Sequence, residues 1–260
     1  MSIYVGTGGW VYPEWRDNFY PAGLPQKREL EYAGSQLTAI EINGTYYGSQ
    51  KPESFRKWHD ETPKGFVFAV KGPRFATNRR VLAESGGSIE KFFASGVTEL
   101  KEKLGPVNWQ FMATKKFDAS DFEAFLKLLP KKVDGWAIRH AVEVRHDSFK
   151  DKEFVELCRR YGVSIVFGAD SDFPLIADVT ADFVYARIMG TKPAEKLGYP
   201  PAMLKTWAQR ANDWEKGCSP KASMLLAPAA SKKRRDVFLF VISGAKERNP
   251  AAAQAIIAAL

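Results

Sequence analysis

The chain has few of the residues on which disulfide-bonded and metal-centred folds are built. Its 260 residues include two cysteines, Cys158 and Cys218, which stand alone in helix-like segments with no CxxC spacing. A disulfide framework or a cysteine-based zinc site is therefore not expected. The three histidines follow no HExxH pattern, so they predict no metal site. Such cysteine usage is typical of a reducing compartment, and the chain is predicted to be cytoplasmic.

Long hydrophobic runs are also missing. No stretch approaches the ~18 apolar residues that a membrane-spanning helix needs. The chain opens directly on the strand-like run IYVGTGGW, without the basic and apolar regions of a secretory signal. We therefore expect neither a membrane partner nor a secretory leader.

Charge, by contrast, is unbalanced. Lysine and arginine number 38 against 30 aspartates and glutamates, for a net charge of +8. This excess predicts an acidic partner, such as a phosphate-containing small molecule or nucleic acid. A basic but merely solvated surface is the alternative. The densest basic run, KKRR at 232–235, comes just before a predicted strand, and we expect it to form a solvated loop.

Strand-like and helix-like segments alternate along the whole chain. The short apolar segments rich in Val, Ile, Phe or Tyr are predicted strands; they lie at 3–7, 38–43, 66–71, 108–113, 141–145, 164–170, 183–188 and 237–242. Segment 120–130 has helical apolar spacing and a candidate N-cap at Ser120. The connection between the sixth and seventh strands looks too short and irregular for a full helix.

This alternation predicts an α/β fold with a parallel sheet and right-handed crossovers. About eight such units in a chain of this length favour a single-domain (β/α)8 TIM-type barrel over residues 1–260. A doubly wound open sheet is the alternative, but GTGGW lacks the G-x-G-x-x-G spacing of a dinucleotide loop. No phosphate-cradling glycine loop or nucleophile elbow is present either, so no organic cofactor is expected.

The period of the strands places polar residues inside the barrel. Side chains of a barrel strand alternate between the interior and the helix layer. Because the helix layer takes the apolar set, the polar set points inward, late in each strand, at the C-terminal mouth where barrel enzymes have their sites. This polar set consists of Glu41, Asn43, Lys71, Gln110, Glu143, Arg145, Asp170 and Arg187.

Six of these residues predict a cluster of mixed charge. Its members are the acids Glu41, Glu143 and Asp170 and the bases Lys71, Arg145 and Arg187. Buried charges are costly unless they are paired or used, so the cluster is a functional candidate, with an internal ion-pair network as the alternative. Mg²⁺ prefers carboxylate ligands, but three neighbouring cations argue against a metal site.

The residue types suggest individual roles within this cluster. A carboxylate removed from water is a stronger base, so Glu41 is the candidate general base. Glu143 and Asp170 are the other candidate catalytic residues. Guanidinium groups match phosphate or carboxylate at two points, so Arg145 and Arg187 are the strongest anion-binding candidates, with Lys71 beside them.

Aromatic residues gather after the first two predicted strands. Trp10, Tyr12 and Tyr46 are candidates for stacking on a ligand, and packing of the rim under the long first loop is the alternative. Trp15 and Phe19 are instead expected to pack under the first loop. Candidate polar contacts come from Asn43 and from Arg74, which begins a basic segment at 74–80, and a solvated loop is the alternative for that segment.

Several motifs resemble the YecE-like family, a domain of unknown function that carries the number seventy-two. The matching stretches are GTGGWVYPEW with FYPAGLP, EINGTYY, segment 58–74, VEVRHDSF and YARIMG. The resemblance covers nearly the whole chain and implies a TIM-type barrel similar to the endonuclease-IV-like and xylose-isomerase-like barrels, with no established reaction. It also implies a set of mouth residues: Trp10, Tyr12, Glu41, Asn43, Lys71, Glu143, Arg145 and Arg187.

The chain departs from this family pattern at three places. Thr77-Asn78 stands where the family usually has Thr-His, and Met189 stands where it usually has a histidine. Segment 241–243 reads Val-Ile-Ser where the family tends to have Phe-Asn-Asn. The resemblance therefore implies a retained pocket more strongly than a retained reaction.

Three functions remain open from the sequence. The first is an enzyme or enzyme-like barrel for a phosphorylated or acidic substrate, with Lys71, Arg145 and Arg187 as anion clamps. The second is a nucleic-acid-binding protein that uses the basic rim and the aromatic residues. The third is a barrel with a degenerate site that serves as a partner in an assembly.

Overall fold

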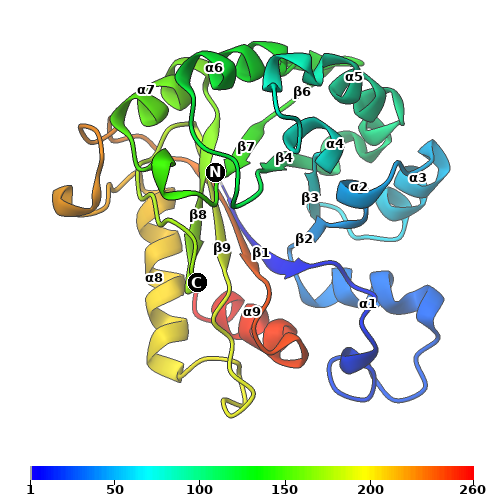
Figure 1. The fold of residues 1–260 in the computed structure, drawn as a ribbon. Helices are drawn as coiled ribbons and strands as arrows, with labels where there is room; N and C mark the ends of the chain where they lie inside the picture. Colours follow the sequence, from blue (N-terminus) through cyan, green and yellow to red (C-terminus); the bar gives the residue numbers. More distant parts are fainter. Residues whose placement is uncertain (1) are drawn as a thin grey trace.

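The computed structural model describes residues 2–260 and has a closed barrel of eight parallel strands at its centre (Figure 1). Neighbours around the barrel follow the order β1, β2, β3, β4, β7, β8, β9 and β10, and β10 pairs with β1. The strands are β1 (Ile3–Gly8), β2 (Ala39–Ile42), β3 (Val67–Lys71), β4 (Leu104–Gln110), β7 (His140–Glu143), β8 (Ser164–Ala169), β9 (Phe183–Ile188) and β10 (Asp236–Val241). All eight predicted strands and the TIM-type barrel are thus confirmed.

Helices surround the strands and link them. The α-helices are α1 (Glu29–Gln36), α2 (Gly44–Tyr47), α3 (Pro52–Asp60), α4 (Arg74–Thr77), α5 (Gly86–Ala94), α6 (Ala119–Leu128), α7 (Lys152–Tyr161), α8 (Pro201–Glu215) and α9 (Asn249–Ile257). Short 3-10 turns are η1 (Pro13–Trp15), η2 (Gln26–Arg28), η3 (Leu82–Ser85), η4 (Val97–Lys103), η5 (Asp147–Phe149), η6 (Ala222–Met224) and η7 (Lys246–Arg248). Residues 170–182, all described in the structure, contain no helix, as expected for the connection between β8 and β9.

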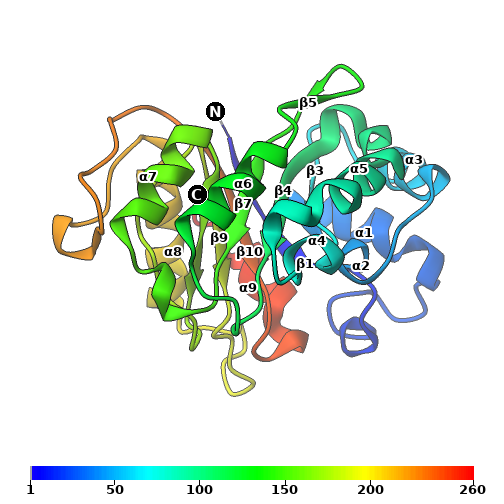
Figure 2. The same cartoon turned by 45° about the horizontal axis from the view of Figure 1, so that its top comes forward.

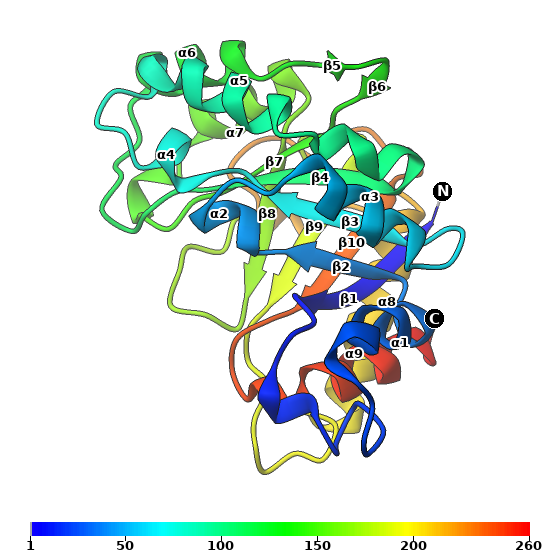
Figure 3. The ribbon, with the colours of Figure 1, turned by 90° about the vertical axis from the view of Figure 1, so that its right-hand side faces the viewer.

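Because the strands are parallel, the barrel has an N-terminal end and a C-terminal end. In Figure 3 the arrows of β2, β3 and β4 point toward the side that carries α2 and α4, away from the marked chain ends. A small antiparallel pair, β5 (Lys132–Val133) and β6 (Trp136–Ala137), lies outside the barrel sheet and projects from the body in Figure 2. The C-terminal mouth is therefore formed by the loops and short helices that follow the strands.

The fourth barrel strand begins earlier than its sequence pattern predicts. β4 starts at Leu104 and includes Pro106, which cannot donate a ladder hydrogen bond. The register between β3 and β4 shifts between Phe68 and Val70, opposite this proline. Such an irregularity accommodates a proline within a paired strand, and the proline is the reason that the sequence pattern missed the start.

Two apolar clusters divide the core as the strand period predicts. The larger one lies between strands and helices and includes Ile40, Ile42 and Val70. The smaller one includes Ala69, Ala141 and Phe240, whose side chains belong to the inward-facing set. In β3 and β7, the charged residues Lys71 and Glu143 come two positions after Ala69 and Ala141 and lie above this apolar cluster.

Two local expectations are corrected. The N-cap of α6 is Asp118 rather than Ser120, because the Asp118 side chain accepts a hydrogen bond from the Asp121 backbone N–H at 2.9 Å. Within the KKRR run, Arg235 is buried, with 2% of its surface exposed. Its guanidinium donates to the backbone carbonyls of Ala181 and Ser231, so this residue ties two loops together instead of lying in solvent.

Among residues 2–260, no helix combines the length and the apolar character needed to cross a membrane.

Candidate functional site

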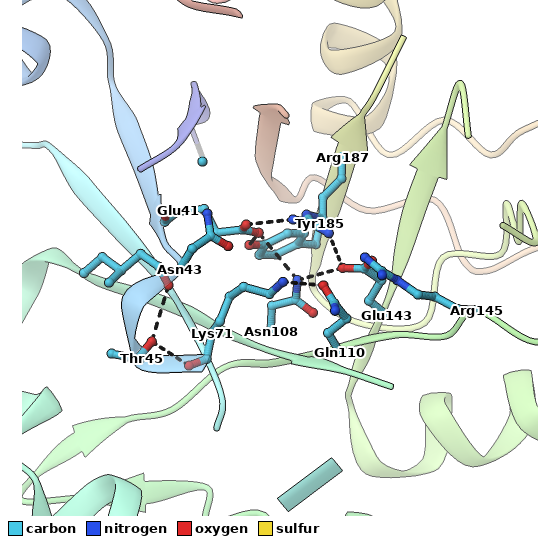
Figure 4. A network of polar contacts seen from close by, with 12 residues as sticks. Glu41, Asn43, Thr45, Lys71, Asn108, Gln110, Glu143, Arg145, Tyr185 and Arg187 are labelled. Atoms are coloured by element: carbon cyan, nitrogen blue, oxygen red, sulfur yellow. Dashed lines mark hydrogen bonds and ion pairs between the residues drawn. The ribbon is translucent and has the colours of Figure 1, made fainter. Parts of the chain in front are cut away.

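Four strands deliver charged side chains to the same level of the barrel interior. Glu41 comes from β2, Lys71 from β3, Glu143 from β7 and Arg187 from β9. All four are buried, since each lies on the inward face close to the C-terminal end of its strand. The sequence prediction of a mixed-charge cluster at the mouth therefore agrees with the structure for these residues (Figure 4).

Arg187 lies at the centre of the cluster and bridges both glutamates. Its Nη2 donates to Glu41 Oε1 at 3.0 Å, and its Nη1 forms an ion pair with Glu143 Oε2. Tyr185, two residues earlier on β9, donates its hydroxyl to Glu41 Oε2 at 2.5 Å. Asn108 Nδ2 contacts Glu143 Oε2 at 3.3 Å. The two carboxylates are thus held in place by partners from three other strand positions.

Arg145 extends the network toward the rim. Its Nε and Nη2 donate to Glu143 Oε1 at 2.9 and 2.7 Å. The guanidinium carbon lies 4.3 Å from the ring centroid of Phe173, in stacking range. Arg145 is part-exposed, so one face of its guanidinium remains available to a ligand.

Lys71 is bound differently from the other charged members. Its Nζ donates to Gln110 Oε1 and lies 4.9 Å from the ring centroid of Tyr46. Within residues 2–260, the ion pairs of the cluster join Arg187 to both glutamates and Arg145 to Glu143, and none of them includes Lys71. An ion-pair network that only closes the barrel would explain Arg187 and the glutamates, but not this lysine.

Burial and charge shift the proton affinities of the cluster in different directions. Burial alone would raise the pKa of Glu143, but the positive charges of Arg187, Lys71 and Arg145 outweigh it and lower this pKa to about 2. Burial lowers the pKa of Lys71 to about 8, helped by the positive charge of Arg187. Burial, and then the charge of Glu41, raise the pKa of Tyr185 well above its usual value. At neutral pH, Tyr185 therefore holds its proton and Glu143 is ionised.

A cavity of about 340 Å³ opens above the cluster. Four cationic side chains line it: Lys71, Arg145, Arg187 and Lys246. Among the described residues, no carboxylate belongs to its lining, because Glu41 and Glu143 lie behind the cations that they bind. The remaining lining is mostly aromatic and polar, with Gly8 and Ile242 besides: Gly8, Tyr12, Trp15, Asn43, Tyr46, Tyr47, Gln110, Ile242, Ser243 and Asn249.

Most of the predicted ligand-binding residues line this cavity. They are Tyr12, Asn43, Tyr46, Lys71, Arg145 and Arg187. Trp10 does not, because its ring packs edge-on against Trp58 and Phe68 on the helix side. Arg74 lies on the exposed rim between the rings of Tyr47 and Phe75. Trp15 packs under the first loop as expected, yet it also forms part of the cavity wall.

Asp170 does not join the acids of the cluster, and this expectation is corrected. β8 ends at Ala169, and Asp170 adopts a left-handed backbone conformation with φ of 57°. The alternation of side chains along the strand therefore no longer applies to it. Its side chain is exposed to solvent and accepts a hydrogen bond from the Tyr199 hydroxyl at 3.0 Å.

The sequence also missed residues that belong to the site. Tyr185 and Asn108 lie on the inward period, but their roles depend on partners from other strands. Lys246 and Asn249 belong to η7 and α9, beyond the last strand, where strand alternation carries no signal. The rule that every loop after a barrel strand contributes to the mouth would have included them.

The histidines lie outside the cavity. His140 is buried on the outward face of β7, where Nδ1 accepts from Trp109 Nε1 at 3.1 Å and Nε2 donates to Pro130 O at 2.8 Å. Burial lowers the pKa of His140 to about 4, in agreement with a neutral ring. The Nδ1 of His146 caps η5 by accepting from the Ser148 backbone N–H. The part of the chain that the structure describes has no group of three His, Cys, Asp or Glu side chains placed to hold a metal ion.

The architecture and the placement of the site define the protein as a TIM barrel with a charged cavity at its C-terminal mouth. The model of the family described as "protein of unknown function DUF72" matches residues 4–260. The chain belongs to this family, which confirms the resemblance of its motifs.

Known proteins share parts of this chain or its fold. It is 27% identical over 150 residues to the UPF0759 protein YecE of Escherichia coli strain K12, covering 56% of this chain and 50% of the relative. It is 32% identical over 114 residues to the UPF0759 protein YunF of Bacillus subtilis strain 168, covering 42% and 39%. In these matches the chain spans about half the length of the curated relatives or less. A crystal structure of a DUF72 family protein from Thermotoga maritima shares the fold, with a TM-score of 0.72, 22% identity, and coverage of 99% and 97%.

The three departures from the family pattern occupy different surroundings. Ile242 and Ser243 line the cavity. Met189 packs against the inner apolar cluster, and Asn78 is exposed on the rim. Only the last of the three altered segments therefore changes the cavity wall itself.

Proposed function

We propose that the mouth cavity binds a small molecule that carries a phosphate or carboxylate group, as the substrate site of an enzyme or as a binding site. The observation that carries this proposal is the lining itself, which presents four cationic side chains and no carboxylate among the described residues. An anion entering the cavity would meet Lys71, Arg145, Arg187 and Lys246 before it approached either glutamate.

The charge balance of the site supports the same proposal. Four cations and two carboxylates give these six residues a formal charge of +2. Among residues 2–260, the Nε of Arg187 is buried and has no hydrogen-bond partner. An anion compensates such excess charge and accepts charge-assisted hydrogen bonds from it. The rings of Tyr12 and Tyr46 and the amides of Asn43 and Asn249 would then contact the rest of the ligand.

The proposed catalytic role of Glu41 stays a prediction with a geometric constraint. Its side chain is fully buried, and its oxygens accept from Arg187 and Tyr185. A proton moved by Glu41 would therefore pass through one of these partners or require them to shift.

Arg145→Ala is expected to weaken anion binding by about 10- to 100-fold, the range that a hydrogen bond to a charged group is typically worth. Isothermal titration calorimetry with inorganic phosphate and with glycerol 3-phosphate measures the effect. Arg160→Ala is the matched control, since it removes the same charge from the exposed face of α7. Equal affinity in wild type and in Arg145→Ala would remove Arg145 from the anion site.

Nucleic-acid binding is the second candidate function, and one surface favours it. Tyr47, in the cavity wall, is 65% exposed, and Phe75 is 59% exposed. The guanidinium carbon of Arg74 lies 5.8 Å from the Tyr47 ring centroid and 5.5 Å from that of Phe75. Exposed aromatic rings combined with arginine are typical of surfaces that bind single-stranded nucleic acid by stacking and charge.

If this second function holds, binding of a single-stranded oligonucleotide will fall steeply between 50 and about 200 mM salt, because phosphate contacts release counterions. Fluorescence anisotropy with a labelled oligonucleotide measures it. Tyr47→Ala with Phe75→Ala should then lower affinity by about 1–3 kcal/mol per lost stacked base. An oligonucleotide that fails to bind even at 50 mM salt rules out this function and leaves the small-anion site unaffected.

A further inference from the structure

Lys71 differs from the three other cations of the cavity in its chemistry as well as its partners. Arg145 and Arg187 are permanently charged guanidiniums, each bound to a glutamate, and Lys246 is exposed. Lys71 Nζ is buried, lines the cavity and donates to the neutral amide oxygen of Gln110. It is therefore a primary amine with no carboxylate partner among residues 2–260, facing a space large enough for a small molecule.

The surroundings of Lys71 give it a larger share of neutral amine than an exposed lysine has, although most of it is still protonated at pH 7. The groups that act on it are Arg187 on β9, Arg145 after β7, Glu143 on β7, Glu41 on β2 and the Tyr46 ring on α2. Burial and the two arginines lower the pKa of Lys71 to about 8, although the two glutamates act in the opposite sense. A neutral amine is the form that attacks carbonyl carbon, and desolvation beside another cation is a known means of activating lysine.

We propose that Lys71 is a nucleophile that forms an imine with the carbonyl group of an aldehyde or ketone, and that this substrate also carries a phosphate or carboxylate group. The inference rests on the proposed anion site, since Arg145, Arg187 and Lys246 would hold the anionic group while the carbonyl group lies at Lys71. It adds a reacting atom and a substrate class to that site.

The reaction balances without any redox partner. The lone pair of neutral Nζ forms a bond to the carbonyl carbon, and the carbonyl oxygen takes up a proton to give a carbinolamine. The hydroxyl group of the carbinolamine takes up a second proton, the C–O bond breaks to release water, and the nitrogen lone pair forms the C=N double bond. The two protons that the nitrogen gives up to solvent or a neighbouring base balance the two that the oxygen takes up. Amine and carbonyl compound are thereby converted to imine and water, and hydrolysis reverses the sequence.

Borohydride trapping tests this proposal directly. The full chain is incubated with glyceraldehyde 3-phosphate, dihydroxyacetone phosphate or pyruvate, then reduced with sodium borohydride and analysed by intact mass and peptide mapping. We expect one stable adduct per chain, located on Lys71, whose rate of formation rises with pH through about 8. Peptide mapping of the wild-type chain identifies which lysine carries the adduct, without the need for a variant. Adducts spread over exposed lysines, or no adduct with any of the three compounds, would overturn the proposal.

Three variants sharpen the result. Lys71→Arg keeps the positive charge but cannot form an imine. Lys71→Met removes the positive charge and the amine. Each of these two variants should therefore lose the adduct. Lys205→Met removes an exposed lysine of α8 and should retain it. Circular dichroism and thermal unfolding establish that each variant is folded; if Lys71→Met is not, Lys71→Arg provides the comparison.

Two outcomes separate this inference from the proposed function. Phosphate binding without any adduct would remove the nucleophile and leave the anion site in place, whereas absence of both would remove both. Glyceraldehyde, which lacks the phosphate, should form the adduct at least tenfold more slowly than glyceraldehyde 3-phosphate. Equal rates would overturn the assignment of an anion-bearing substrate.

Discussion

Arg187→Met is expected to destabilise the protein by about 3–5 kcal/mol, the cost of leaving buried charges without their partner. Arg187 is 4% exposed and its guanidinium binds both Glu41 and Glu143. Methionine fills part of the same volume but supplies no positive charge and no donor. Two buried carboxylates would then face each other across the barrel, with Tyr185, Asn108 and Arg145 as their remaining hydrogen-bond donors.

Urea unfolding at pH 7 measures this loss, and two comparisons identify its cause. Arg28→Met removes an exposed arginine whose ion pair with Glu31 lies on the surface, and should have little effect on stability. Adding Glu41→Gln to Arg187→Met should recover part of the lost stability, since one unpaired charge is then absent. A loss below about 1 kcal/mol in Arg187→Met would show that the cluster is more hydrated than its burial indicates.

The barrel and its inward-facing charges could be predicted because both follow from local periodicity. Alternation along each strand assigned Glu41, Lys71, Glu143 and Arg187 to the interior, and burial agrees for all four. The rule still held for Asn43 and Arg145, one and two residues past the ends of β2 and β7, but it failed at Asp170. Asp170 lies one residue past β8 in a left-handed conformation, so the same rule assigned it to the wrong surroundings.

The pairing inside the cluster could not be predicted from the sequence. Arg187 and Glu41 are 146 residues apart, and their contact depends on the curvature of the closed sheet. The periodicity of single strands gives no information about which acid meets which base across the interior. Lys71 therefore looked like one anion clamp among three, and its separation from both carboxylates became visible only in the structure.

The aromatic residues after β1 show that strand periodicity does not predict side-chain direction in the loops. Trp10 and Tyr12 follow the same strand, and the sequence predicts the same role for both, yet Trp10 packs against Trp58 while Tyr12 lines the cavity. The difference arises from the turn after β1, where the Tyr12 hydroxyl donates to the backbone carbonyl of Gly8 at 2.5 Å. No periodic rule describes such a turn, so side-chain direction there depends on the fold.

Glu143 is expected to make the protein acid-sensitive. Its pKa of about 2 in the folded protein lies below the value of 4.5 for an unperturbed glutamate, because the charges of Arg187, Lys71 and Arg145 outweigh the effect of burial. A depressed folded-state pKa stabilises the fold at pH values above the unfolded pKa, and this contribution is lost as pH falls through the folded pKa. At about 1.4 kcal/mol per pKa unit, the contribution is of the order of 3 kcal/mol, lost between pH ~5 and pH ~2.

The stability difference between wild type and Glu143→Gln isolates this contribution. Glutamine resembles a protonated glutamate, so the difference should be largest near pH 7. It should shrink as pH falls below about 4.5, because acid protonates Glu143 in the unfolded wild-type chain while the folded protein keeps it ionised, with more than half of the change complete by about pH 3. Urea unfolding at pH 7, 5, 4 and 3 follows it. Glu90→Gln, on the exposed face of α5, is the control and should show a small difference at every pH. The contrary outcome is a stability difference between wild type and Glu143→Gln that stays constant with pH. That outcome would mean that the three cations do not stabilise the Glu143 carboxylate. It would also contradict a permanently charged cluster beneath the cavity whose carboxylates are compensated by cations.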